Sequence, residues 1–390
     1  MASIPQTEQV GVRCVLMRGG TSKALFFHER DVPPAGPARD RLLKRAMGTP
    51  DVLQIDGMGG SRLVTSKVAI VQRSAREDAD VDYTFAQVDV DRDGVGHDAN
   101  CGNISSAVAP FAIDEGLVEA VEPVTTVRIH NTNTGKLLVS KVRVKNGKAR
   151  VHGDCAIPGV PGTGSEILMD YAGTVGAKTG RLLPTGQAVD TVTLEDGRRI
   201  EVSLCDTANP CVFIAAPSLG MHGSELPDAI SADRALIETL GEIQSKMGER
   251  IGLYADWRQV HLPGLPLAVI VAPPADYVDV NGRTQVAADM DLRARLVFLG
   301  KCHDSMAGTG SMCTAAASRV TGTAVHQAIG AGRAATGTLR IGHPLGVMEV
   351  KVVADTSGHP ADTRFSALGL VRTARRLMAG EVYVPVEEHA

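Results

Sequence analysis

A single thiol stands at the predicted mouth of a helix in the first third of the chain. Asn100-Cys101-Gly102-Asn103 precedes a stretch of small and apolar residues, 104–117, which predicts a buried helix. The first turn of a helix presents unpaired N–H groups and the positive end of the helix dipole. Such a place favours an anion, either a thiolate or a substrate carboxylate. The alternative interpretation is a buried structural cysteine followed by a glycine turn.

A second glycine-rich turn has the same layout. Gly308-Thr309-Gly310-Ser311 comes before the small-residue segment 312–322, which predicts another helix. The N–H groups and hydroxyls of this turn could bind a second carboxylate, although a plain glycine turn explains the pattern equally well. Cys313 falls inside the helix, where we expect it to pack in the core rather than to react.

Two further polar segments could contact an anionic substrate. Arg18-Gly19-Gly20-Thr21-Ser22-Lys23 combines exposed backbone with hydroxyls and cations, which complement carboxylate oxygens. It lacks the spacing of a phosphate-binding loop, so the alternative is a structural turn. Ser66-Lys67 opens the apolar run "VAIV". A desolvated lysine there could act as a base, whereas the alternative is a side chain that extends to solvent from a strand end.

Three other sites are disfavoured. "DVDRDG" at 89–94 imitates the start of a calcium loop, but its twelfth position is Asn100 rather than a glutamate. "GAGRAATG" at 330–337 precedes a predicted strand, whereas a dinucleotide loop precedes a helix. The eleven histidines show no HxxxH or HExxH spacing, so we expect no metal site.

Composition narrows the class of protein. The 390 residues are enough for two domains, and the net charge of −4 with 3% aromatic residues argues against a nucleic-acid partner. Seven scattered cysteines without CxxC spacing indicate reduced thiols. No apolar run is long enough to cross a membrane, and residues 1–14 do not resemble a signal peptide. We therefore expect a cytoplasmic protein without membrane or nucleic-acid partners.

The coarse pattern predicts an α+β protein with mainly antiparallel sheet. Short alternating runs bounded by glycine, proline or asparagine predict many strands. Helical patterns occur at 38–48, 104–117, 231–252, 292–300, 312–322 and 366–380. The two halves look alike, because each has a glycine-rich turn before a small-residue helix. We expect two domains, 1–190 and 191–390, with the final helix packing back on the first.

These features resemble the diaminopimelate epimerase fold. In that fold two cysteines at the N-termini of two central helices face each other across the substrate. The resemblance implies two similar domains, each a sheet wrapped around a central helix. The position of the second cysteine is Ala307 in this chain, so two-thiol racemisation is not expected.

The whole chain is more closely similar to the methylaconitate isomerase (PrpF) family, which includes methylitaconate isomerase and 4-oxalomesaconate tautomerase. The signatures occur in order as "MRGGTSKALFF", "QIDGMGG", "TSKVAIV", "DVDY", "NCGN", "LLPTG", "GHPLG" and "RTARRLMAG". The resemblance implies a site in the cleft between the domains, with Lys67 and Cys101 as the catalytic pair and no cofactor or metal.

The chemistry implied is a 1,3-proton shift that moves a C=C bond in a small unsaturated di- or tricarboxylate. Lys67 would remove a proton, donors at the two helix N-termini would stabilise the dienolate, and Cys101 would return a proton two atoms away. Asn209, His303, His343 and Arg372 are weaker candidates for the site. The residues expected to bind substrate are Arg18, Gly19, Gly20, Thr21, Ser22, Lys23, Ser66, Gly102, Asn103, Asn209, Gly308, Thr309, Gly310 and Ser311.

Two alternatives remain open at this level. One is an amino-acid epimerase of the same fold, which Ala307 disfavours. The other is a non-catalytic carboxylate-binding protein that assists an aconitase-like enzyme, which would not need both Lys67 and Cys101. A homodimer is also expected.

Overall fold

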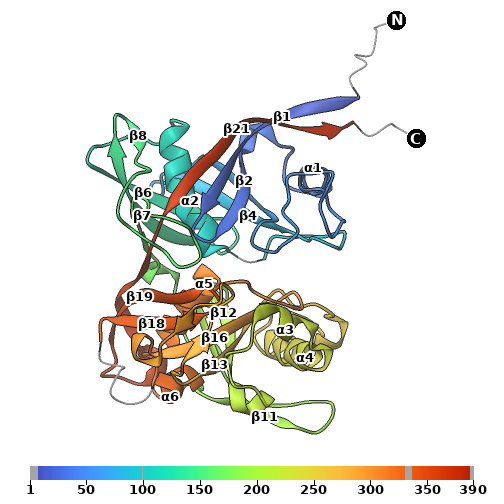
Figure 1. The fold of residues 1–390 in the computed structure, drawn as a ribbon, viewed down its shortest axis with the longest axis vertical. Coiled ribbons are helices and arrows are strands. Elements are labelled where there is room, and N and C mark those ends of the chain that lie inside the picture. Colours follow the sequence, from blue (N-terminus) through green and yellow to red (C-terminus); the bar gives the residue numbers. More distant parts are fainter. Residues whose placement is uncertain (1–7, 99, 330–335, 387–390) are drawn as a thin grey trace, which may run out of the picture.

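The chain folds into two domains that lie one above the other (Figure 1). The computed structural model describes residues 8–98, 100–329 and 336–386. The glycine-rich run 330–337 falls largely outside the described residues, as do residues 1–7 of the N-terminal segment.

Among the residues that the structure describes, the first domain contains two α-helices and a curved part of a sheet that continues into the second domain. The elements of the first domain are β1 (Gln9–Gly19), β2 (Ser22–His28), α1 (Pro37–Met47), β3 (Lys67–Arg73), β4 (Val81–Val88), β5 (Val95–Gly96), α2 (Gly102–Asp114), β6 (Val124–Asn131), β7 (Lys136–Lys145), β8 (Lys148–Ala149) and β9 (Ile167–Asp170).

The elements that follow β9 form the second domain, except that the last two strands return to the first domain. They are β10 (Asp190–Thr193), β11 (Arg199–Thr207), β12 (Asn209–Ala215), α3 (Pro227–Ala232), α4 (Arg234–Arg250), β13 (Leu267–Ala272), β14 (Tyr277–Val278), β15 (Thr284–Gln285), β16 (Leu292–Phe298), β17 (Lys301–Cys302), α5 (Gly308–Ala317), α6 (Ala324–Ile329), β18 (Thr338–His343), β19 (Gly346–Asp355), β20 (Arg364–Arg372) and β21 (Ala374–Pro385).

The strand pairing repeats between the domains. In the first domain β2 is parallel to β3, β3 antiparallel to β4, β4 parallel to β6 and β6 antiparallel to β7. In the second domain the same four relations hold between β12 and β13, β13 and β16, β16 and β18, and β18 and β19. The predicted α+β fold with two similar domains is therefore confirmed.

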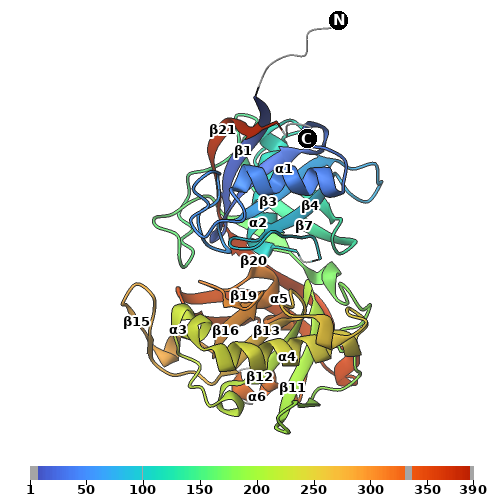
Figure 2. The ribbon, with the colours of Figure 1, turned by 90° about the vertical axis from the view of Figure 1, so that its right-hand side faces the viewer.

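Each sheet encloses one helix and is covered by another on its outer face. α2 is buried from Gly102 to Ile113 and contacts β1, β2, β3, β6 and β7, while α5 is buried throughout and contacts β11, β12 and β19. α1 packs on the outside of the first sheet and α4 on the outside of the second (Figure 2). Small side chains make this enclosure feasible, because the strands must approach the central helix from all sides.

Two of the predicted helices are wrong. Residues 292–300 form β16, whose seven residues are all buried, and a continuous apolar run does not separate a buried strand from a helix. Residues 366–380 belong to β20 and β21. β20 pairs with β19 and β9, and β21 pairs with β1 along its full length, so sheet pairing overrides the local helix propensity. The return of the C-terminal segment to the first domain is nevertheless seen (Figure 1).

Helix boundaries also differ in a way that matters for the site. α5 begins at Gly308 rather than at 312, so the predicted glycine turn is itself the first turn of the helix. The predicted helix at 231–252 is divided into α3 and α4 at Asp233, whose carboxylate accepts from the N–H of Leu236. Within the described ranges, no helix combines the length and the apolar character that a membrane span needs.

Two neighbouring residues of β20 test the strand assignment of 366–380. Leu370 is 3% exposed and belongs to the main core, whereas Val371 on the opposite face is 36% exposed. Leu370→Ala should lower the free energy of unfolding by about 2–5 kcal/mol, and Val371→Ala by less than about 1 kcal/mol. Urea unfolding followed by circular dichroism measures both, and equal losses would contradict the assignment.

Candidate active site

The two enclosed helices meet at their N-termini. A Cβ atom added to Gly102 would lie 2.8 Å from the carbonyl carbon of Gly308, and one added to Gly308 would lie 2.8 Å from that of Gly102. Only glycine allows two backbones to approach so closely. The positive ends of the two helix dipoles therefore converge at the junction of the domains, where an anion is favoured.

Cys101 occupies the N-cap of α2 and is 8% exposed. Its carbonyl oxygen accepts hydrogen bonds from the Ser105 N–H at 2.8 Å and the Ser105 hydroxyl at 2.9 Å, which holds the residue at the helix mouth. Ala307 is the N-cap of α5, the corresponding position in the second domain. The junction thus carries a thiol at one helix N-terminus and a methyl group at the other.

Lys67 is the first residue of β3 and is 3% exposed. Its Nζ donates to Oε1 of Gln87 at 2.8 Å and lies 5.3 Å from the centre of the Phe85 ring. The Gln87 amide nitrogen donates to the carbonyl oxygen of Ser66 at 2.9 Å, which turns the amide oxygen toward the lysine. In the described part of the chain no carboxylate forms an ion pair with Lys67, so the site favours an anionic ligand beside it.

The sheet brings Lys67 and Cys101 to the same end of the first domain. Lys67 is paired with Gln87 near the end of β4, and from there the chain continues through β5 to the N-terminus of α2. Across the junction, burial and, after it, the charge of Lys67 lower the pKa of His303 to about 3. Lys67 therefore acts on a side chain of the second domain.

A network of buried polar groups joins the N-termini of α2 and α5. The Asn209 amide nitrogen donates to the carbonyl oxygen of Asn100 at 2.9 Å and to the hydroxyl of Thr309 at 3.0 Å. The backbone N–H of Asn100 donates to Oδ1 of Asn209 at 3.2 Å. Asn209 and Thr309, both predicted to bind substrate, thus hold the loop before Cys101 against the second domain.

The segment from Arg18 to Lys23, which is predicted to bind a carboxylate, packs on the N-terminus of α2. A Cβ atom on Gly19 would lie 2.5 Å from the carbonyl oxygen of Asn103, and one on Gly20 would lie 2.3 Å from its Oδ1. The hydroxyl of Thr21 accepts from the Asn103 amide at 3.0 Å. These two glycines therefore allow contact with the protein's own helix.

Four residues of this segment line a cavity of about 460 Å³, which also borders Thr373 and Arg375. They are Arg18, Thr21, Ser22 and Lys23. The buried hydroxyl of Ser22 has no hydrogen-bond partner in the described part of the chain, so it is available to a ligand. Arg18 is partly engaged, because it donates to the carbonyl oxygens of Gly20 at 2.9 Å and Thr373 at 2.7 Å. A larger cleft of about 1260 Å³ is lined from both domains and includes Arg372.

Three other predicted residues make internal contacts. The Ser66 hydroxyl accepts from the Gln54 amide at 2.7 Å, and the Ser311 hydroxyl donates to the carbonyl oxygen of Gly308 at 2.8 Å. A Cβ atom on Gly310 would lie 2.3 Å from Cδ1 of Leu296, so this glycine allows α5 to pack against β16. Their role toward a substrate stays a prediction.

Sequence reasoning did not identify Gln87 or Ser305 as parts of the site. Gln87 lies in a predicted strand, where nothing in the pattern distinguishes a glutamine that faces a buried lysine. Ser305 had a usable signal, because it lies three residues before the glycine-rich turn. Its hydroxyl is 2.8 Å from that of Thr21 in the other domain.

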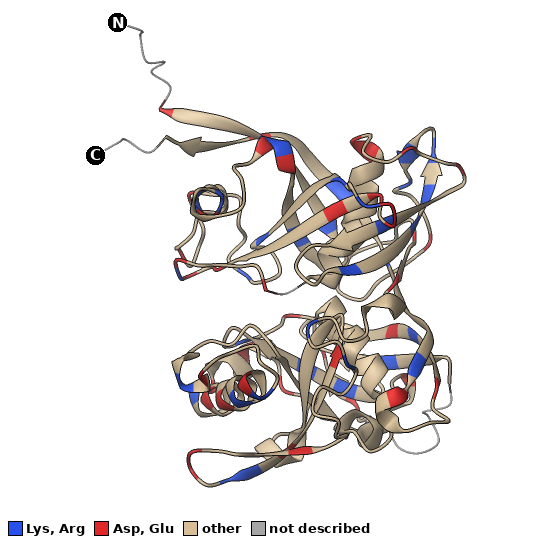
Figure 3. Ribbon diagram, turned by 180° about the vertical axis from the view of Figure 1, so that it is seen from behind, with Lys and Arg blue, Asp and Glu red and all other residues tan. Residues whose placement is uncertain are grey.

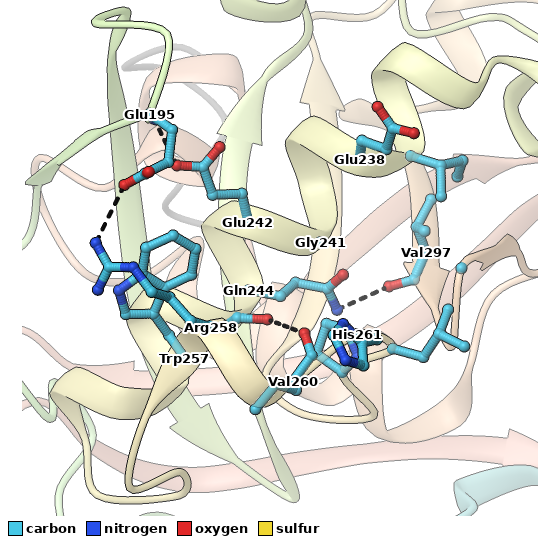
Figure 4. A pocket seen from close by; sticks show the side chains of 15 residues that line it. Glu195, Glu238, Gly241, Glu242, Gln244, Trp257, Arg258, Val260, His261 and Val297 are labelled. Carbon is cyan, nitrogen blue, oxygen red and sulfur yellow. Dashed lines mark hydrogen bonds and ion pairs between the residues drawn. The ribbon is translucent and has the colours of Figure 1, made fainter.

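A separate cavity of about 410 Å³ lies beside α4, and none of the predicted site residues lines it (Figure 4). Trp257 is flanked there by Lys246 and Arg258, whose cations lie 4.4 Å and 4.5 Å from its ring. Residues of both charge signs occur on α4 and in both domains (Figure 3). Among the described residues no group of three histidine, cysteine or acidic side chains is placed to hold a metal ion.

Comparison with known proteins shows which family this chain belongs to. The family described as PrpF protein matches residues 9–385. The chain belongs to the PrpF family. Its relatives in that family include a 3-methylitaconate isomerase of Eubacterium barkeri, 46% identical over 97% of this chain and 98% of the relative. A 4-oxalomesaconate tautomerase of Pseudomonas putida is 38% identical, covering 96% of this chain and 97% of the relative. A 2-methyl-aconitate isomerase of Shewanella oneidensis is 37% identical, covering 97% and 98%.

Solved structures agree with the PrpF assignment. The structure of a methylitaconate-delta-isomerase has a TM-score of 0.77 and 45% identity, covering 98% of this chain and 99% of that one. A hydroxyproline epimerase from Agrobacterium vitis has a TM-score of 0.55 at 12% identity, covering 99% and 95%. The second match shows a shared fold alone.

Contact between Gly102 and Gly308 can be tested by adding a methyl group. Gly102→Ala should lower the free energy of unfolding by about 1–3 kcal/mol, because the new Cβ overlaps the backbone of the other domain. Gly241→Ala is the matched control, since Gly241 lies inside α4 with no atom within 4 Å of an added Cβ. It should raise stability by up to about 1 kcal/mol. Equal stability of the two variants in urea would show that the helix mouths are not in contact.

Acid should destabilise the protein through two buried histidines. Burial lowers the pKa of His303 and of His343 to about 3, below the ordinary value of 6.5. The unfolded chain then binds more protons than the folded one between these values, so stability is lost as the pH falls below about 6.5. Each histidine should cost about 2 kcal/mol between pH 7 and pH 5.

Urea unfolding at the two pH values checks this expectation. His303→Gln should remove about half of the histidine-dependent loss, whereas His152→Gln, at an exposed position, should leave it unchanged. A loss that is identical in wild type and His303→Gln would contradict a neutral buried His303.

Proposed function

We propose that this chain catalyses a 1,3-proton shift that moves a C=C bond in a small unsaturated di- or tricarboxylate. That the chain is an isomerase follows from its membership of a family whose named relatives are isomerases and a tautomerase over nearly its full length. The proposal adds the reaction path, the residues and the class of substrate.

Proton transfer is assigned to Lys67 and Cys101. Lys67 as the free amine removes a proton from the carbon two atoms away from the one that Cys101 protonates, and the double bond moves between them. The excess charge of the dienolate resides on the carboxylate oxygens, where N–H groups of Gly102, Asn103 and the first turn of α5 can donate. The roles of Lys67 and Cys101 exchange when the reaction runs in the other direction.

One observation carries this proposal. Two helix N-termini converge at Gly102 and Gly308, with a thiol at one mouth and a buried lysine, free of carboxylate partners among the described residues, at the same end of the sheet. A carbon acid next to a carboxylate is weak, so stabilising its anion is the main requirement of the reaction. The converging dipoles and N–H groups meet this requirement.

The substrate that we place first is 3-methylitaconate, because the relative of that name is 46% identical. 2-Methylaconitate, 4-oxalomesaconate and aconitate are tricarboxylates rather than dicarboxylates, but they also carry a carboxylate on a C=C bond, and they complete the panel. Amino-acid epimerisation is disfavoured, since Ala307 stands where a second thiol would be needed. A cytoplasmic location is supported by the seven free cysteines. A homodimer stays a prediction.

Proton NMR in D2O with this panel is the decisive experiment. The wild type should move the double bond of at least one acid and incorporate deuterium at the new saturated carbon. Lys67→Ala and Cys101→Ser should each lower the rate by about 10²–10⁴-fold, since each removes a proton-transfer group.

Two controls separate chemistry from folding. Cys14→Ser removes a buried thiol of β1, and Lys145→Ala removes an exposed lysine of β7; both should keep the wild-type rate. Absence of isomerisation with every acid of the panel, in a protein whose circular dichroism is native, would contradict the proposed reaction for these substrates.

A further inference from the structure

A chain of hydrogen bonds crosses the domain junction and ends at a buried histidine. Arg372 Nε donates to Asn103 Oδ1 at 3.1 Å, and Asn103 Nδ2 donates to the Thr21 hydroxyl at 3.0 Å. The Thr21 hydroxyl is 2.8 Å from that of Ser305, which is 3.5 Å from Nδ1 of His303. The backbone N–H of Ser305 also donates to this Nδ1, at 3.0 Å.

The bonds at the two ends of the chain have fixed directions. A guanidinium has only donors, so Asn103 must turn its oxygen toward Arg372 and its nitrogen toward Thr21. The Thr21 oxygen accepts from Asn103, and of the Thr21 and Ser305 hydroxyls either one can donate to the other. At the far end of the chain the backbone N–H of Ser305, which can only donate, points to Nδ1 of His303. Nδ1 of His303 is therefore an acceptor, and the proton of the neutral ring lies on Nε2.

The surroundings keep the His303 ring neutral. The residue is 3% exposed, follows β17 and lies 6.3 Å from the Phe298 ring. Two titratable groups face it from other elements, Lys67 at the start of β3 and His343 at the end of β18. Burial and the Lys67 charge both oppose an imidazolium, which brings its pKa to about 3.

We propose that His303 contacts the substrate and donates its Nε2–H to the oxygen on which charge develops during the proton shift. In the described part of the chain Nε2 makes no hydrogen bond, while Nδ1 is held by Ser305. This inference rests on the proposed function, because it assigns a further residue to the same reaction. Arg372, Asn103, Thr21 and Ser305 act as positioning residues that orient the ring.

A neutral donor suits this reaction better than a charged one. An imidazolium beside Lys67 would repel the protonated form of the lysine and could transfer its own proton to the dienolate. A neutral imidazole stabilises the developing charge by a hydrogen bond and keeps its proton, so proton transfer stays with Lys67 and Cys101. Removal of one preorganised donor of this kind lowers the rate by about 10²–10³-fold.

The tautomer can be observed without any substrate. Two-bond ¹H–¹⁵N NMR of histidine-labelled protein, with the His303 signals assigned by their absence in His303→Gln, should show Nε2 protonated and Nδ1 unprotonated. The signals should not titrate between pH 5 and pH 8. Protonation at Nδ1, or a titration near pH 6.5, would overturn the proposal.

Kinetics test the contact with substrate. His303→Leu should lower kcat by about 10²–10³-fold and change KM by less than about threefold, because the bond strengthens only as charge develops. His303→Gln keeps an N–H donor near the position of Nε2 and should recover at least about tenfold of the loss. A folded His303→Leu enzyme whose kcat stays within about threefold of wild type would overturn the proposal. If His303→Leu does not fold, a folded His303→Gln enzyme whose kcat is lowered by more than about 10²-fold overturns it.

The positioning chain has its own matched pair of variants. Thr21→Val breaks the link between the domains, whereas Thr21→Ser keeps the hydroxyl. Thr132→Val removes a hydroxyl–hydroxyl bond of 2.7 Å to Thr84, on the surface of the first domain. We expect Thr21→Val to lower kcat, Thr21→Ser to recover most of that loss, and Thr132→Val to leave kcat within about twofold of wild type. Equal kcat in all three would contradict the positioning role.

Failure of this inference is distinguishable from failure of the proposed function. A wild type that isomerises no acid of the panel contradicts the function, while the NMR signature still decides whether the ring is a neutral Nε2–H donor. An active wild type with an active His303→Leu variant contradicts the inference alone.

Discussion

The close contact of two helix N-termini is the constraint on which the rest of the structure depends. Gly102 and Gly308 meet backbone to backbone, and a methyl group on either one would overlap the other. Two positive dipole ends brought together repel each other unless something negative compensates them. The fold encloses both helices in sheets and joins them by Asn209, so their mouths stay together and present their N–H groups to an anion.

The duplicated topology makes the differences between the domains informative. Cys101 and Ala307 occupy the same N-cap position, and β3 begins with Lys67 where β13 begins with Leu267. Both of the proposed proton-transfer groups therefore belong to the first domain, whereas a two-thiol racemase needs one from each. In the proposed reaction the second domain contributes donors instead, from the first turn of α5 and from His303. This placing of proton-transfer groups in one domain and hydrogen-bond donors in the other fits a proton shift between two carbons better than inversion at one carbon.

Buried polar groups hold the junction around the helix N-termini. The ion pairs between the domains, Arg62–Asp228, Arg62–Asp304 and Lys301–Asp91, join more exposed side chains. The amides of Gln87, Asn103 and Asn209 each use both their oxygen and their nitrogen, and each links a reacting or positioning residue to the backbone or to the other domain. Satisfied networks of this kind orient side chains without supplying a competing negative charge. A carboxylate in their place would occupy the site that the substrate's carboxylate is to fill.

Local sequence determined the class of fold and the two helix N-termini, because glycine-rich turns before small-residue helices are encoded over a few residues. The candidate pair of Lys67 and Cys101 came from the resemblance of the whole chain to the PrpF family. Local sequence misassigned 292–300 and 366–380 as helices, since β16 is apolar throughout and β21 exists only through its pairing with β1. Gln87 beside Lys67, and the chain from Arg372 to His303, join residues up to 284 positions apart. Such contacts have no local signal, and only the tertiary structure decides them.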